Sequence, residues 1–137
     1  RYLNPLMRLA EDFTADCSDF SSTRSEFQEA MQDYTLLFRN FLANEIFSDL
    51  ILPDDTLEDM LLHLEWIALE YTAIRQSLYL HCSAEGTGIL RYETVRDSIV
   101  ILSRMTGYED ADIREYLENS FASPIWDWGY FALVVGK

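Results

Sequence analysis

Apolar residues recur at steps of three and four along most of the chain, which is the spacing of one face of an α-helix. The clearest runs cover about residues 6–15, 27–46 and 95–107, and a shorter one covers 113–117. Only five Gly and three Pro are present, too few for the frequent sharp turns of a β-sandwich or barrel. The pattern predicts an all-α chain of five to six helices.

The longest predicted helix covers about residues 56–82 and is apolar around most of its circumference. Its main stripe comprises Leu57, Met60, Leu61, Leu64, Ile67, Ala68, Tyr71, Ile74 and Leu78. Further apolar side chains, including Trp66, lie elsewhere around the helix. Such a helix is packed by neighbours on several sides. We therefore expect a bundle around it, forming a single domain over residues 1–137.

Local signals place several helix ends. Residues 23–26 have the form of a capping box, and residues 55–58 offer a second cap just after Pro53 has ended the preceding run. Gly86 and Gly88 mark a loop after the long helix.

The two ends of the chain give separate expectations. The chain begins at Arg1 and not at Met, and we expect it to be a fragment of a longer protein. Residues 125–135 are strongly apolar. As a helix or as an extended segment, this ending either docks between helices or contacts a partner.

The chain is acidic, with 24 Asp and Glu against ten Lys and Arg and a net charge of -14. Nine of the ten basic residues are Arg, and the single lysine is Lys137. Nucleic-acid contacts are built from clustered cations, so the charge argues against a nucleic-acid partner. It favours a cationic partner, unless it reflects compositional drift alone.

No complete catalytic or metal-binding constellation is visible. The two histidines, His63 and His81, form no recognised metal-ligand pattern, and Cys17 and Cys82 are too few for a thiolate cluster. We expect the cysteines to be core residues in a reducing, cytoplasmic compartment. No secretory signal and no membrane span is predicted.

Arg75 and His81 stand six positions apart, a spacing similar to the short motif of the helical ribonuclease toxins known as HEPN domains. A ribonuclease that uses these two residues is therefore one alternative interpretation.

Four segments resemble the flagellin lysine-N-methylases, known as the FliB family. They are residues 39–47, 50–53, 70–74 and 91–104, the last of which ends in Ser-Arg as in the family. Together they fall within about residues 34–104 and are mostly helix-core positions. One departure follows them: the family often has an acidic residue and His after Ser-Arg, whereas this chain has Met105-Thr106.

The resemblance implies a parent enzyme that transfers methyl groups from S-adenosylmethionine to lysines of flagellin. It also implies that a 4Fe-4S cluster and the chemistry belong to the N-terminal region, which leaves this part a structural or flagellin-docking role. Acidic residues near predicted helix starts are the candidate substrate-binding residues, although the helix dipole alone would also account for their positions. They are Asp54, Asp55, Glu58, Asp59, Glu109, Asp110 and Asp112.

The main alternative is a free-standing acidic interaction protein, such as an immunity protein or an inhibitor. It accounts equally well for the charge of -14 and needs no further region of chain.

Overall fold

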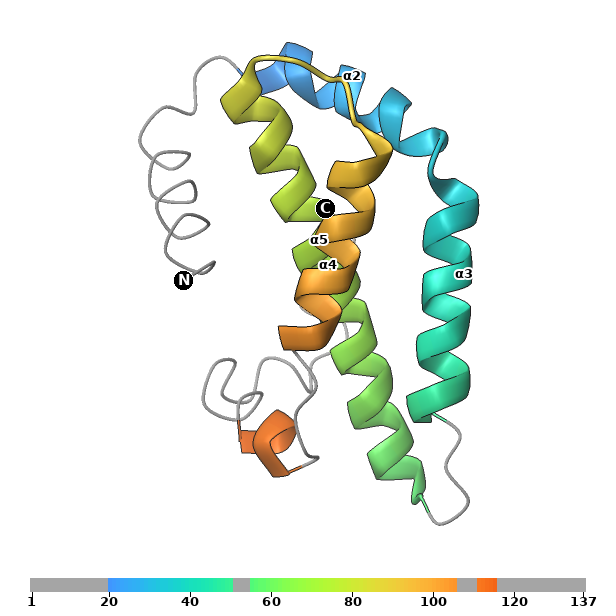
Figure 1. Cartoon of the computed structure of the whole chain (residues 1–137). Helices are drawn as coiled ribbons and strands as arrows, with labels where there is room; N and C mark the ends of the chain where they lie inside the picture. Colours follow the sequence, from blue (N-terminus) through green and yellow to red (C-terminus); the bar gives the residue numbers. More distant parts are fainter. Residues whose placement is uncertain (1–19, 51–54, 106–110, 116–137) are drawn as a thin grey trace. The chain divides into compact units, whose positions relative to one another are not determined.

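The computed structural model describes residues 20–50, 55–105 and 111–115 (Figure 1). The helices of this part are α2 (Phe20–Gln32), α3 (Thr35–Glu45), α4 (Leu57–Glu85) and α5 (Tyr92–Met105). A π-helical turn, η1 (Ile46–Leu50), continues α3, and residues 111–115 form one further helical turn. None of these described residues lies in a strand, so the prediction of an all-α fold is confirmed. The helix predicted at residues 6–15 and the apolar ending at 125–135 lie outside the described residues.

The predicted apolar run at 27–46 is two helices that meet at a sharp bend (Figure 1). Short-range bonds turn the chain there, from the Asp33 N–H to the Ala30 carbonyl (3.3 Å) and from the Tyr34 N–H to the Met31 carbonyl (3.1 Å). α2 begins at Phe20, before the predicted box at 23–26, so that predicted start was wrong. Serine costs only about half a kcal/mol in a helix, and the serines upstream of the box do not interrupt it.

A capping box starts α4. The Thr56 hydroxyl accepts a hydrogen bond from the Asp59 N–H (3.2 Å), and the Asp59 carboxylate accepts one from the Thr56 N–H (3.1 Å). Each side chain thereby satisfies a backbone donor that the helix leaves open. The box lies one residue after the cap predicted at 55–58.

A glycine turn ends α4. Gly86 has a positive φ of 63°, its N–H donates to the Ser83 carbonyl (3.2 Å), and the Thr87 N–H donates to the Cys82 carbonyl (3.1 Å). This bond pair is a Schellman motif, in which glycine adopts the left-handed conformation at little cost. The predicted loop at Gly86 and Gly88 is confirmed.

The described residues fall into two compact units, each described by itself. The first comprises Arg1–Arg39 and Ala73–Leu102, and in it α5 runs along the second half of α4 (Figure 1). The Tyr34 hydroxyl donates to the Leu90 carbonyl at 2.7 Å. The buried apolar residues of this unit are Phe27, Phe38, Ile74, Leu78, Leu80, Cys82, Leu90, Val95 and Ile99.

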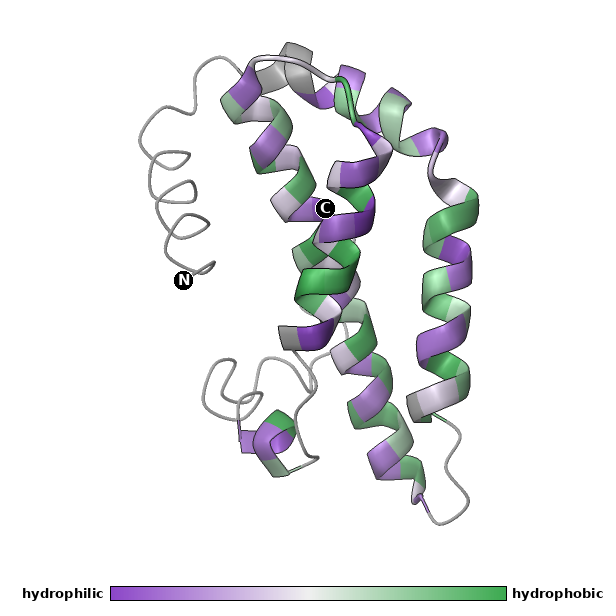
Figure 2. Ribbon diagram, viewed as in Figure 1, coloured by the Kyte–Doolittle hydropathy of each residue, from purple (hydrophilic) through white to green (hydrophobic). Residues whose placement is uncertain are grey.

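The second unit comprises Asn40–Thr72 and Ser103–Lys137. In its core, the fully buried Leu62 of α4 packs against Ile113, and Trp66 and Leu69 pack against the same cluster. The predicted stripe on α4 is only partly buried in this half, because Ile67 is buried whereas Leu57 and Leu64 are exposed. Apolar residues occur along the whole of α4 (Figure 2), so helical spacing alone does not select the buried side.

α3, α4 and the last turn of α5 run from one unit into the other. α4 contributes core residues to both units, as expected of the central helix of the predicted bundle. The single domain over residues 1–137 stays a prediction. No helix in the described part of the chain is long and apolar enough to cross a membrane.

Candidate functional site

The acidic charge of the chain is concentrated in the second unit. This unit contains fourteen Asp and Glu against three Arg and Lys, whereas the first contains ten against seven. The resulting net charges are -11 and -3. A cationic partner is therefore attracted most strongly to the second unit.

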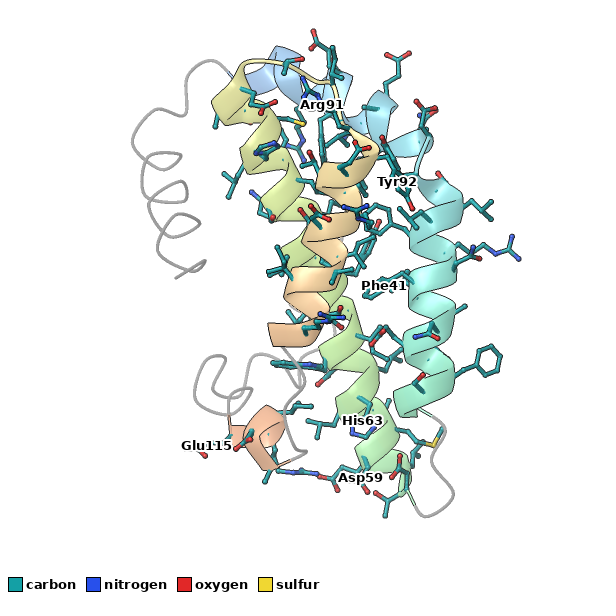
Figure 3. The ribbon with its side chains drawn as sticks, viewed as in Figure 1. Phe41, Asp59, His63, Arg91, Tyr92 and Glu115 are labelled. Carbon is teal, nitrogen blue, oxygen red and sulfur yellow. The ribbon has the colours of Figure 1, made fainter. Side chains whose placement is uncertain are left out.

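Two of the predicted site residues form ion pairs at the start of α4. One nitrogen of the Arg114 guanidinium lies 2.9 Å from the Glu58 carboxylate, and the other lies 3.4 Å from that of Asp59. Asp59, labelled in Figure 3, also closes the capping box with Thr56. The hydrogen bonds from Thr56, and then the Arg114 charge, hold the pKa of the Asp59 carboxyl below its ordinary value.

The remaining predicted residues differ in their surroundings. Asp112 is exposed on the same helical turn as Arg114. Its neighbour Glu115, which the sequence analysis did not single out, is also exposed and points away from α4 (Figure 3). Three further candidates lie outside the described residues: Asp54, Glu109 and Asp110. Substrate binding by the acidic residues stays a prediction, and Glu58 and Asp59 already pair with Arg114 of the 111–115 turn.

Asp55, just before α4, lies beside His63, which is on the first half of that helix. The nearest atoms, His63 Nδ1 and Asp55 Oδ2, are 3.7 Å apart, and their side chains are 7% and 15% exposed. This distance is too long for a hydrogen bond. Within the described ranges, no group of three or more His, Cys, Asp or Glu side chains is placed to hold a metal ion.

Glu65 is a charged residue in the core of the second unit that the sequence analysis missed. Its side chain is 1% exposed, and its Oε2 atom has no hydrogen-bond partner in the described part of the chain. Burial raises the pKa of this carboxyl above its ordinary value. The available signal was its spacing, three residues after Leu62 and four before Leu69, on an otherwise apolar face of α4.

Arg75 and His81, on which the ribonuclease interpretation depends, both lie on the second half of α4. His81 Nε2 is 3.3 Å from the Glu85 carboxylate, one helical turn further on, and both side chains are about half exposed. Residues six apart in a helix point about 120° away from each other. The ribonuclease interpretation stays a prediction.

Cys82 is buried in the first unit, as predicted for a core cysteine. Burial, followed by the nearby Glu85 charge, raises the pKa of its thiol and disfavours the reactive thiolate. Cys17 lies outside the described residues.

The fold and these residues define an acidic, all-α protein domain with carboxylates gathered at one end of its longest helix. The family model of the FliB lysine N-methylase C-terminal domain matches residues 1–134 of the chain. The chain therefore belongs to this family, which confirms the resemblance found in the sequence within about residues 34–104. No curated protein and no solved structure matches the chain.

Proposed function

We propose that this domain docks flagellin for a FliB-type lysine N-methylase. In this proposal the N-terminal region of the same protein supplies methyl transfer, its donor S-adenosylmethionine and a 4Fe-4S cluster. The observation that carries the docking role is the net charge of -11 on the second unit of a lysine-methylase domain. A negative field attracts the ammonium groups of a lysine-bearing substrate and raises the encounter rate.

The exposed carboxylates of the 111–115 turn are the most direct candidates for this attraction. Asp112 and Glu115 are both exposed, and Glu58, beneath the turn, has a side chain that is 67% exposed. Exposed charges act mainly on association rate and salt dependence rather than on final affinity. The near-absence of lysine, with Lys137 alone, also limits methylation of the chain by its own enzyme.

The docking proposal is tested by titrating the chain with monomeric flagellin at about 50 mM and about 300 mM salt, which span strong and weak screening. We expect binding that weakens as salt is raised. Replacing Asp112→Asn together with Glu115→Gln should slow association several-fold.

The matched control is Glu29→Gln with Asp33→Asn, which removes two exposed charges from the first unit. It should have little effect on association. Undetectable binding of the unaltered chain at low salt would reject the docking role, and equal slowing in both double variants would reject the assignment to the 111–115 turn.

A further inference from the structure

Glu65 is the buried group that neither the fold nor the proposed docking surface explains. The Glu65 side chain is 1% exposed, and its Oε2 atom has no hydrogen-bond partner among the described residues. The folded state therefore bears the free-energy cost of removing this carboxyl group from water without a compensating hydrogen bond. Buried groups with perturbed pKa values cluster at functional sites, where a ligand can supply the missing partner.

The surroundings of Glu65 suit a particular ligand. Helical spacing places it on the same face of α4 as Leu62 and Leu69, with Trp66 beside it. Leu62 is fully buried, and Trp66 and Leu69 pack against the cluster that it forms with Ile113. A carboxylate set among apolar and aromatic side chains matches a long alkyl stem that ends in an ammonium group.

We propose that Glu65 receives the ε-ammonium group of a lysine of the protein substrate, with the lysine stem against Leu62, Trp66 and Leu69. This inference rests on the proposed docking function and deepens it, because it names the residue that anchors the substrate. The anchored lysine is not the methyl acceptor. Pairing with a carboxylate keeps the amine protonated, whereas attack on a methyl group needs its free electron pair.

A lysine stem reaches Leu62 only if the 111–115 turn moves, because Ile113 packs against Leu62. In the described part of the chain, this turn contacts α4 through Ile113 and Leu62 and through the ion pairs of Arg114. The Arg114 pairs are partly exposed, so they contribute little to holding the turn. A lysine stem that replaces Ile113 against Leu62 restores the apolar contact and adds the ion pair with Glu65.

The test compares two peptides that differ in one ammonium group. One is a flagellin-derived peptide with a single lysine, and the other has norleucine, which has the same stem without the nitrogen, at that position. We expect the chain to bind the lysine peptide about tenfold or more tightly than the norleucine peptide, which corresponds to one buried charged hydrogen bond. Glu65→Gln should reduce this ratio to near one.

Glu29→Gln is the matched control, because it makes the same chemical change at an exposed position of the first unit. It should leave the ratio unchanged. A ratio that Glu65→Gln does not alter would overturn the assignment. Should that variant fail to fold, Glu65→Asp keeps the charge on a shorter stem: a weakened lysine preference supports the proposal, and an undiminished one overturns it.

The two proposals fail separately. Salt-dependent binding of intact flagellin, with no effect of Glu65→Gln on the peptide ratio, leaves the docking role and removes the lysine site. A lysine preference that depends on Glu65, without detectable binding of flagellin, removes the docking role and leaves the site.

Discussion

Replacing the buried carboxyl of Glu65 by an amide of the same size should stabilise the chain at neutral pH. The carboxylate is 1% exposed and its Oε2 atom is unpartnered within the described residues, so the folded state bears its desolvation without a compensating bond. Leaving such a group unsatisfied costs about 1–3 kcal/mol. Since glutamine also buries polar atoms, we expect Glu65→Gln to raise the free energy of unfolding by about 1–2 kcal/mol.

The gain should depend on pH in a defined direction. Burial raises the pKa of Glu65 above its ordinary value of 4.5, so the folded chain holds this proton more tightly than the unfolded chain. The destabilising effect is therefore absent below about pH 4.5, begins as the pH rises past that value, and is complete above the folded pKa. Asp59 acts oppositely: its pKa is lowered from 3.8, and its stabilising contribution is lost only as the pH falls below that value.

The assay is urea unfolding of the unaltered chain and of Glu65→Gln between about pH 4.5 and pH 8, a range that avoids the titration of Asp59. The difference between them should grow with pH, and the neutral-pH melting temperature should rise by about 3–8 °C. Glu115→Gln, which alters an exposed carboxylate, should show neither effect. A loss of stability in Glu65→Gln, or a difference independent of pH, would refute the reasoning.

Three further substitutions test contacts within the units. Gly88→Ala should destabilise by about 1–3 kcal/mol in chemical denaturation, because the added Cβ would overlap the Glu26 Cβ and lie 3.1 Å from the Glu26 backbone carbonyl carbon. Tyr34→Phe should lower the free energy of unfolding by about 0.5–1.5 kcal/mol in the same measurement, because it removes the 2.7 Å hydrogen bond to the Leu90 carbonyl. Thr56→Ala should cost about 0.5–2 kcal/mol through loss of the α4 cap, with faster amide exchange in the first turn of α4.

Each of these has a control or a contrary outcome. Tyr92→Phe makes the same change as Tyr34→Phe on a half-exposed side chain and should be close to neutral. Wild-type stability of Gly88→Ala would mean that the loop can move off α2. Unchanged exchange at the start of α4 in Thr56→Ala would mean that the capping box does not hold that turn.

Helix content and several helix ends could be predicted because they depend on local chemistry. The cap at the start of α4 was placed within one residue, and the glycine turn at its end was identified, since both depend on side chains and backbone within one turn. The apolar spacing at Ile74 and Leu78 was also right, and both are fully buried.

The buried side of the first half of α4 could not be predicted, because apolar residues surround it there. Leu57 and Leu64 belong to the predicted apolar stripe and are exposed, while Glu65 was overlooked and is buried. The pairing of Arg114 with Glu58 joins residues 56 positions apart, and no local pattern encodes a contact at that separation. What distinguishes these residues is the packing of distant segments, which only the structure supplies.

The sharing of α3 and α4 between the two units has a consequence during synthesis. The first unit combines Arg1–Arg39 with Ala73–Leu102, and the second combines Asn40–Thr72 with Ser103–Lys137. As the chain leaves the ribosome, the first unit stays incomplete until residues 73–102 have emerged, and the second must await residues beyond 102. Neither unit can therefore be released as a finished intermediate early in translation, and a protease cut within residues 40–72 of the nascent chain would separate the two parts of the first unit.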